Sequence, residues 1–348
     1  MMELTTVWFV LIGVLWAGYF MLEGFDFGVG MLFPVLGRGR DGERRRRVLL
    51  NTIGPVWDGN EVWLVTAAGA TFAAFPEWYS TLFSGFYPLL LLVLVALIVR
   101  VLAFDYRGKR DDPVWRRRWD ATIVFGSVVP AFAWGLVFTN MVHGVPINPD
   151  GEYTGTLVTL LNPLALLGGL TTVALFLLHG CIFIALKTDG EIRRDARVMA
   201  TRVGALAAVL AVALLVVLNA RTGDVVSWVC SGVAAVALVV GLAYNVRGRE
   251  GLAFAGTFVA IGLTVAALFT MLFPDVMPST TDAAWSLTTS NASSTQLTLT
   301  IMSWVALIFT PIVVLYQAWT YWTFRRRIST DQIPDATEPR MPRQEVAH

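Results

Sequence analysis

Apolar runs of about 20 residues, the length an α-helix needs to cross a bilayer, follow one another along almost the whole chain. Short polar or basic segments separate them. The pattern predicts an all-α, polytopic membrane protein with nine transmembrane helices. We place these spans near 5–36, 48–75, 77–104, 119–143, 157–186, 200–219, 225–245, 252–273 and 297–324. The first run has no basic segment before it and is too long for the apolar part of a signal peptide, so we expect it to be retained.

The charged residues support this interpretation and predict an orientation. Only 15% of the residues are charged, against about 25% in a soluble domain. With nine spans, every Lys and Arg except Arg221 falls on one side of the membrane. The positive-inside rule then places the N-terminus outside and the C-terminus in the cytoplasm. We interpret the basic loops as topology signals that contact anionic lipid, not as a nucleic-acid surface.

Two segments outside the spans stand apart in composition. Residues 329–348 are polar, contain proline and lack periodicity, so we expect a disordered cytoplasmic tail after a membrane domain over 1–328. The segment 274–294 is rich in Thr and Ser, and we expect a flexible or partner-facing loop on the outer side.

Four carboxylates lie inside the first two spans: Glu23, Asp26, Asp58 and Glu61. Each costs about 2.5 kcal/mol or more at the centre of a membrane helix, which makes it a candidate functional residue. Within each pair, the i,i+3 spacing places both acids on one helix face. Asp26 and Asp58 both lie about 15 Å from the expected cytoplasmic ends of their spans. If the two helices pack face to face, the four acids converge, and some would then be neutral and able to relay protons.

The neighbouring residues leave alternatives open. Gly24 and Gly28 permit close helix packing beside Asp26. Pro55 either kinks the second span or starts a new helix, in which case Asp58 lies in a first turn, nearer the surface. The acids would also fit a purely structural role, pairing with an arginine such as Arg100. That residue could equally reach the membrane interface with its long side chain.

Other polar residues in the spans carry weaker signals. Asp105 and Asp120 lie at inner helix ends, where they are either interfacial acids beside arginines or a mouth for protons. His143 and His179 are expected near opposite sides of the membrane, so they cannot both ligate one haem iron. The two cysteines, Cys181 and Cys230, give neither a disulfide framework nor a metal site.

Two aromatic residues flank the second acidic pair. Trp57 and Trp63 are six residues apart and fall on roughly opposite faces of a straight helix. For Trp63, a packed or lipid-facing aromatic and a functional residue are both open interpretations.

Several motifs together resemble subunit II of the cytochrome bd quinol oxidases. The strongest are residues 18–30 (GYFMLEGFDFGVG) and 54–63 (GPVWDGNEVW), and the second is highly specific. Weaker pieces lie at 125–135, 162–163, 186–190 and 297–319, so the resemblance covers nearly the whole chain.

The resemblance implies a fold and a role. The fold would be two four-helix bundles plus one peripheral helix, in the bacterial inner membrane. The complex would oxidise quinol and reduce oxygen to water without pumping protons. Subunit I would hold two haems b, one haem d and the quinol site, so this chain would ligate no cofactor. Some members carry a structural quinone in subunit II or bind small single-span accessory subunits.

The resemblance also implies roles for particular residues. Asp26 and Asp58 match acidic stations of a cytoplasmic proton path, with Trp57 and Asp58 near the haem propionates of the partner. Asp105 resembles a member on the proton-uptake side, and Trp63 matches an aromatic beside a lateral oxygen entrance. Glu23, Glu61 and Asp120 complete the expected path.

Two other functions stay open at this point. A secondary transporter would use the acidic hairpin to couple protons or sodium, although no second copy of the acidic pair is visible. A scaffolding subunit would use the acids only to hold its partner.

Overall fold

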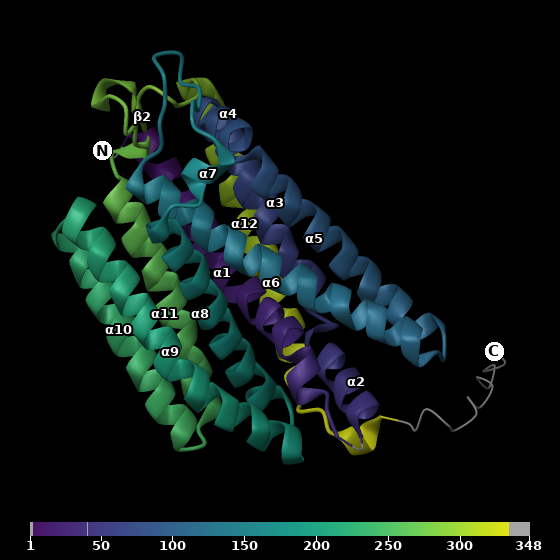
Figure 1. Cartoon of the computed structure of the whole chain (residues 1–348). Coiled ribbons are helices and arrows are strands. Elements are labelled where there is room, and N and C mark those ends of the chain that lie inside the picture. The colour runs from purple at the N-terminus through teal and green to yellow at the C-terminus, as the bar shows by residue number, and fades with distance from the viewer. Residues whose placement is uncertain (1–2, 40, 334–348) are drawn as a thin grey trace.

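The computed structural model describes residues 3–39 and 41–333, and almost all of them lie in helices packed side by side (Figure 1). The helices are α1 (Leu4–Leu36), α2 (Gly42–Ile53), α3 (Trp57–Ala74), α4 (Pro76–Gly85), α5 (Tyr87–Tyr106), α6 (Pro113–His143), α7 (Leu157–Leu160), α8 (Pro163–Lys187), α9 (Gly190–Thr222), α10 (Val225–Val246), α11 (Glu250–Leu272) and α12 (Gln296–Thr323). Short 3-10 turns lie at η1 (Arg107–Lys109), η2 (Ala283–Trp285) and η3 (Thr330–Gln332). The expected tail over 329–348 lies largely outside the described residues.

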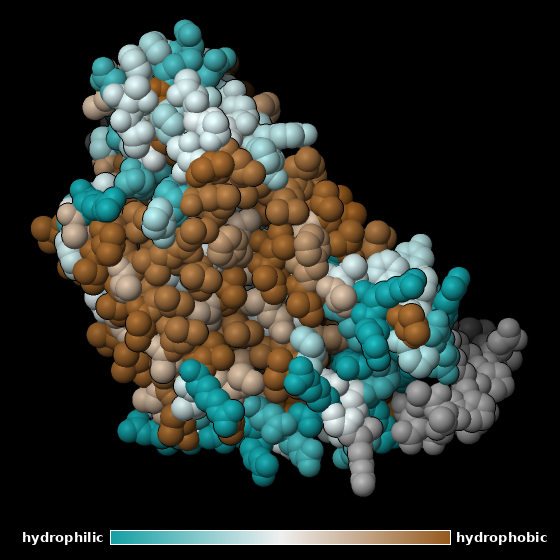
Figure 2. Space-filling model, in the orientation of Figure 1, coloured by the Kyte–Doolittle hydropathy of each residue, from teal (hydrophilic) through white to brown (hydrophobic). Residues whose placement is uncertain are grey.

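Eight helices in the described ranges are long and apolar enough to cross a membrane: α1, α5 with η1, α6, α8, α9, α10, α11 and α12. The space-filling view shows the consequence, a broad hydrophobic belt between two polar ends (Figure 2). Because such a belt would be unstable in water, the structure is that of a multi-pass membrane protein.

The expected span 48–75 is not one continuous helix. It divides into α2 and α3, which are separated at Gly54, Pro55 and Val56. The proline has no amide hydrogen to donate to a continuing helix, and α3 therefore begins afresh at Trp57. Of the two interpretations of Pro55, the structure has the new helix.

Two further helices begin later in the structure than the sequence predicted, and each has a proline in its first turn. The span expected over 77–104 is divided in the structure: its first part forms the separate helix α4, and the membrane helix α5 starts only at Tyr87, with Pro88 in its first turn. The span expected from residue 157 begins at Pro163, because α7 is a separate turn. Proline is favoured at both starts, since the first amides of a helix have no partner within it.

The first helix, α1, occupies the centre of the structure. It packs against α3, α6, α8 and α11, and it lies between the green helices α9 to α11 and the blue helices α3 to α5 in Figure 1. Among the described helices, the last helix, α12, packs closely only against α1 and α3. Only 6% of its most apolar 18-residue stretch is buried. Most of its surface is therefore left for lipid or a partner.

A seam of glycines brings α1 against α8. A β-carbon built on Gly28 would lie 2.1 Å from the carbonyl oxygen of Phe176, and one on Gly180 would lie 2.5 Å from the backbone of Gly28. Only hydrogen fits at these positions, so the two helices approach at backbone distance. The seam fixes the rotation of α1, which decides where its acids point.

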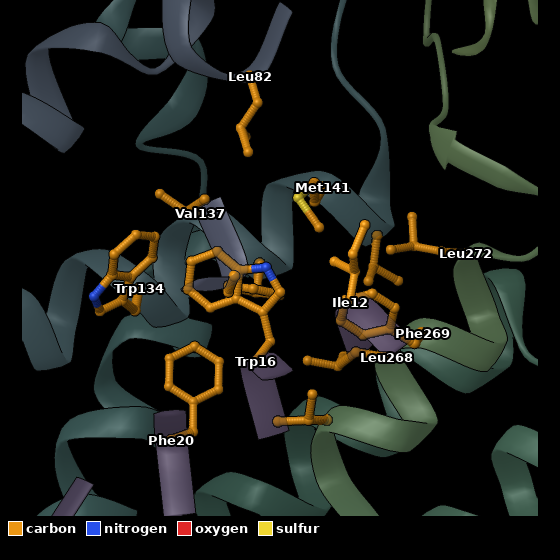
Figure 3. Packing of buried hydrophobic residues seen from close by; sticks show 14 of the residues in the cluster. Ile12, Trp16, Phe20, Leu82, Trp134, Val137, Met141, Leu268, Phe269 and Leu272 are labelled. Atoms are coloured by element: carbon orange, nitrogen blue, oxygen red, sulfur yellow. The ribbon is translucent and has the colours of Figure 1, made fainter. Parts of the chain in front are cut away.

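Aromatic side chains fill the half of the structure that carries the first turns of α1. Trp16 packs on Trp134 and Phe138 with ring centroids 4.9 Å apart in both pairs, and Phe20 lies 5.1 Å from Phe138. Figure 3 shows Trp16 and Phe20 from α1 facing Trp134 of α6, with Leu268 and Phe269 of α11 closing the cluster. Edge-on aromatic pairs of this kind add stability beyond their buried area.

The segment 274–294 is folded, in contrast to the flexible loop expected. It forms the antiparallel pair β1 (Asp275–Met277) and β2 (Leu287–Thr288) near the ends of α6 and α11. Val276 and Met277 are fully buried there, and Val145 donates its amide to the carbonyl of Pro278. These apolar anchors hold a Thr- and Ser-rich segment that composition alone would leave unstructured.

We expect Gly28→Leu to prevent the packing of α1 on α8, because its side chain would overlap the Phe176 carbonyl. The matched control is Gly232→Ala in α10, whose added β-carbon meets nothing within 4 Å. Purified yield and thermal denaturation in detergent measure the effect. Wild-type yield and melting temperature for Gly28→Leu would contradict the proposed role of the seam.

Candidate functional site

An ionisable cluster lies in the interior of the structure where α1, α3 and α5 meet. Its members are Glu23 and Asp26 of α1, Asn60 of α3 and Arg100 of α5, which we call the acid cluster. Glu23, Asp26 and Asn60 are fully buried and Arg100 is 1% exposed. Polar groups at this depth in a membrane protein mark a candidate functional site.

Arg100 forms a buried ion pair with Glu23. Its guanidinium also lies over the rings of Phe27 and Phe104, 4.8 Å and 5.3 Å from their centroids. These contacts offset part of the cost of removing the charge from water. Of the two interpretations of Arg100, the structure has the one in which it pairs with an acid instead of reaching the interface.

Asp26 is held by a chain of hydrogen bonds that reaches α12. Asn60 donates to Asp26 Oδ2 over 2.7 Å. The carbonyl oxygen of Asn60 accepts from the hydroxyl of Tyr321 over 2.6 Å and from the amide of Gln317 over 3.2 Å. Trp63 in turn donates its indole N–H to Gln317 Oε1 over 2.8 Å. The network ties the outermost helix to the innermost acid.

Each buried acid keeps one oxygen without a protein partner. Among the described residues, neither Glu23 Oε2 nor Asp26 Oδ1 meets a hydrogen-bond donor. A buried polar atom of this kind needs a partner, such as a water molecule or a proton on the oxygen itself. The cluster therefore has the capacity to bind a proton or a water in addition to its fixed contacts.

The second acidic pair, Asp58 and Glu61, is less buried within the protein than the first pair, Glu23 and Asp26. Since α3 begins at Trp57, Asp58 lies in its first turn and is exposed, while Glu61 is half-buried. Glu61 is close enough to interact electrostatically with Glu23 on one side and with Asp58 on the other. The acids of α1 and Glu61 of α3 therefore lie near one another, and the four acids differ in burial, from Glu23 and Asp26 in the core to Asp58 on the exposed side of α3.

The two tryptophans of α3 face different neighbours, as their spacing predicted. Trp57 contacts the ring of Phe104 in α5, with centroids 5.4 Å apart. Trp63 packs on Gly18 of α1, where an added β-carbon would lie 2.3 Å from the indole ring. Trp63 is therefore a packed aromatic in this chain, and its hydrogen bond to Gln317 makes it part of the network around Asp26.

Asp120 belongs to a second cluster of charges, at the end of the structure where α2, α5 and α6 meet. Arg107 donates to Asp120 over 2.5 Å and makes a bidentate contact with Glu43 over 2.8 and 2.9 Å. Arg46 lies 3.6 Å from Asp120. Asp105, two residues before Arg107, is exposed at the same end and has no ion pair among the described residues.

Glu43 is the acid most strongly influenced by its arginine neighbours at this end. Burial alone would raise the pKa of Glu43, but the hydrogen bonds and charge of Arg107, with the charges of Arg116 and Arg47, hold that pKa below its ordinary value. Glu43 is therefore charged at neutral pH, and its contacts with Arg107 connect α2 to the end of α5.

The histidines show no arrangement suited to an iron ligand. His179 is buried, and its two ring nitrogens already bond to the Thr257 hydroxyl over 2.7 Å and to the Met21 carbonyl over 3.1 Å. His143 lies at the end of α6, where it lines a cavity together with Arg221 of α9. Within the described ranges, no group of three or more His, Cys, Asp and Glu side chains could hold a metal ion. Among the described residues, His143 and His179 therefore do not come together at one iron site.

Sequence reasoning found the acids but missed the residues that hold them. Asn60 lies between Asp58 and Glu61 in the motif, yet an amide gave no signal beside two carboxylates. Gln317 and Tyr321 lie more than 250 positions away from it in the chain. A polar residue inside an otherwise apolar final span was the one available signal.

The fold and the cluster together define a polytopic helical membrane subunit with an ionisable site inside its first helices. The family model described as cytochrome bd terminal oxidase subunit II matches residues 4–324, and the chain belongs to that family. It is therefore a subunit of a terminal oxidase of the bacterial cytoplasmic membrane, and the transporter alternative is not favoured.

Relatives and a solved structure agree with this assignment. The chain is 41% identical over 335 residues to cytochrome bd ubiquinol oxidase subunit 2 of Bacillus subtilis (strain 168), covering 94% of this chain and 98% of the relative. It is 38% identical over 367 residues to cytochrome bd-I ubiquinol oxidase subunit 2 of Escherichia coli (strain K12), covering 94% and 96%. A chain from the bd oxidase of Geobacillus thermodenitrificans shares the fold, with a TM-score of 0.74, 17% identity, and coverage of 93% and 99%.

Removing one partner of the buried ion pair should destabilise the protein strongly. We expect Arg100→Leu to cost about 3 kcal/mol or more, because Glu23 would be left as an uncompensated buried charge. The double variant Arg100→Leu/Glu23→Leu should recover part of this loss. Thermal denaturation of the purified protein measures both, and a double variant less stable than the single one would contradict the pairing.

The charge cluster at Glu43 should make stability depend on pH. Because the folded pKa of Glu43 is lowered, its contribution is fully present above the unfolded value of about 4.3 and is lost as pH falls through the folded value. Glu43→Gln should therefore lower the melting temperature at pH 7, and the difference from wild type should shrink below about pH 4. Glu77→Gln, at an exposed acid outside this cluster, is the matched control.

Proposed function

We propose that this chain works as subunit II of a quinol oxidase complex that reduces oxygen to water, and that its acid cluster supplies protons to the haem-bearing subunit I. The relatives named above are ubiquinol oxidase subunits. Haem in the partner supplies the electron transfer and the oxygen chemistry. This chain would position acids that bind protons and pass them on.

One observation carries the proposal: the four acids of α1 and α3 lead from the buried core to the exposed surface. Asp26 and Glu23 are fully buried, Glu61 is half-buried, and Asp58 is exposed on α3, where none of the described elements covers it. Acids used only to stabilise this subunit would end in the core. Asp58, with Trp57 beside it, would meet the haem propionates across the subunit interface.

Protons would be taken up at the basic end of the molecule. The contact between Trp57 and Phe104 places the start of α3 beside the end of α5, where Asp105 is exposed. Asp105 would take protons from the cytoplasm, and the acids of α1 and α3 would carry them to Asp58. Asp120 would act from within its ion cluster, where its carboxylate orients Arg107.

The topology that goes with this direction has nine crossings. With 18 residues, α3 is about 27 Å long, and it would form the second crossing after the short α2. The helices α1, α3, α5 and α6 would form one four-helix bundle, α8 to α11 would form the second, and α12 would be the peripheral helix. The basic residues on α2, η1 and the start of α9 would place that end in the cytoplasm and the N-terminus outside.

Other parts of the proposal concern the surroundings of the cluster. Trp63, packed on Gly18 at the edge of α3, would line a lateral entrance for oxygen. Lipid, a structural quinone or a small single-span subunit would cover the exposed sides of α12. The membrane domain would extend over 1–328, followed by the polar tail.

A scaffolding role is the competing proposal, and the ion pair of Glu23 with Arg100 favours it. Under that alternative, the acids would matter for assembly alone. The two proposals predict different rates of oxygen reduction when an acid is replaced by the uncharged amide of the same shape.

The test replaces Asp58 and Asp26 separately by asparagine in the purified two-subunit complex. We expect Asp58→Asn to assemble with the normal haem absorption spectrum, yet to reduce oxygen about tenfold or more slowly, because an amide does not relay a proton. Asp26→Asn should slow turnover in the same way. Asp150→Asn, an exposed acid in the loop after α6, is the matched control.

Normal turnover in both variants, with normal haem content, would favour the scaffold and contradict the proton path. Purification of this chain as a colourless homo-oligomer without a haem-bearing partner would contradict the oxidase role itself. An absorption band of haem d in the wild-type complex would support it.

A further inference from the structure

A cavity lies at the end of the molecule opposite the basic loops. It has a volume of about 440 Å³, and the ends of α6 and α9 and the start of α8 surround it. In Figure 1 this is the end that carries α7 and β2. The acid cluster lies on other helices, and the proton path does not use this cavity.

The cavity has two cationic or protonatable side chains and no acidic one. Arg221 of α9 and His143 of α6 both line it, together with the side chains of Asn140, Asn162 and Thr159. None of the lining residues is Asp or Glu. The side-chain amides of Asn140 and Asn162 already donate to oxygens within the protein, so Arg221 and His143 are the side chains that can bind an oxyanion in the cavity.

Arg221 has no charged or hydrogen-bonded partner among the described residues. Within the described ranges, its guanidinium makes no ion pair and no hydrogen bond. The nearest acid along the chain, Asp224, instead caps α10 by accepting from the amide of Ser227 over 2.7 Å. Arg221 is also the one basic residue that the sequence places on this side of the membrane, against the charge rule that the other basic residues follow.

The helix geometry and the surroundings favour the same ligand. The start of α8 faces the cavity through Pro163 and Leu164, and a helix N-terminus carries a partial positive charge. Val158 directly precedes the lining residue Thr159, Val225 begins α10 four residues after Arg221, and the two valines are 78% and 80% exposed. These apolar side chains suit the acyl chains next to a polar headgroup at the membrane surface.

We propose that this cavity binds a phosphate-bearing anion, with Arg221 and His143 as the principal ligands of the phosphate oxygens. A phospholipid headgroup of the outer leaflet and free inorganic phosphate share this chemistry. The exposed valines favour the lipid headgroup.

The test uses the purified oxidase complex, stripped of lipid by detergent exchange, and three probes: dioctanoyl phosphatidylglycerol, dioctanoylglycerol without phosphate, and inorganic phosphate. Binding is measured by native mass spectrometry and by the shift in melting temperature. We expect the phosphatidylglycerol to bind and stabilise, and dioctanoylglycerol to do neither. Stabilisation by inorganic phosphate alone would support the site and identify the free anion as its source.

Variants locate the binding in the cavity. Arg221→Gln and His143→Gln should each weaken the binding of the phosphate probe, about tenfold or more for the arginine, which loses a charged hydrogen bond. Arg221→Lys should retain part of the affinity. Arg247→Gln, at an exposed arginine on the opposite end, is the matched control. Equal affinity of wild type and both glutamine variants, or no binding of either phosphate probe, would overturn the proposal.

Discussion

The structure depends on one buried ion pair, between Arg100 and Glu23, in an interior from which water is excluded. Arg100 and Glu23 are both buried, and neither would be stable there without the other. Their contact joins α5 to α1, the helix that packs against most of the others. The rings of Phe27 and Phe104 surround the guanidinium and reduce the cost of its burial. The pair thus fixes the position of the site and of the central helix together.

The acid cluster combines a fixed part with a part that has spare capacity. Arg100 holds Glu23 by one oxygen, and Asn60 holds Asp26 by one oxygen, so the geometry is set. The second oxygen of each acid lacks a protein donor. A proton-conducting site needs both properties, because the acids must keep their spacing while the proton occupancy changes.

The helix α12 shows how a weakly packed element acquires a precise position. Its surface is largely exposed, so apolar packing within this chain contributes little to its placement. Gln317 and Tyr321 hydrogen-bond to Asn60, and Trp63 bonds to Gln317. In the low dielectric of a membrane interior, hydrogen bonds of this kind are strong and directional. The network connects the position of α12 to Asp26, so a partner that binds α12 would also act on the site.

The sequence by itself determined the class of the protein, because the length and polarity of each apolar run follow from the thickness of the bilayer. It also determined the candidate acids, since a carboxylate in such a run is rare and costly. Gly24 and Gly28 indicated that a helix could pack closely beside Asp26, without indicating which one. The new helix after Pro55 was one of two interpretations that local rules allowed.

The tertiary structure decided what depends on residues far apart in the chain. It selected Glu23 as the partner of Arg100, buried Asp26 behind Asn60, and left Asp58 exposed on α3. It also folded 274–294 around buried Val276 and Met277 and grouped Arg221 with His143 at one cavity. Periodicity and composition describe one segment at a time. Pairing and burial are set by how the helices rotate and cross, and close backbone contacts such as Gly28 against Gly180 fix those variables.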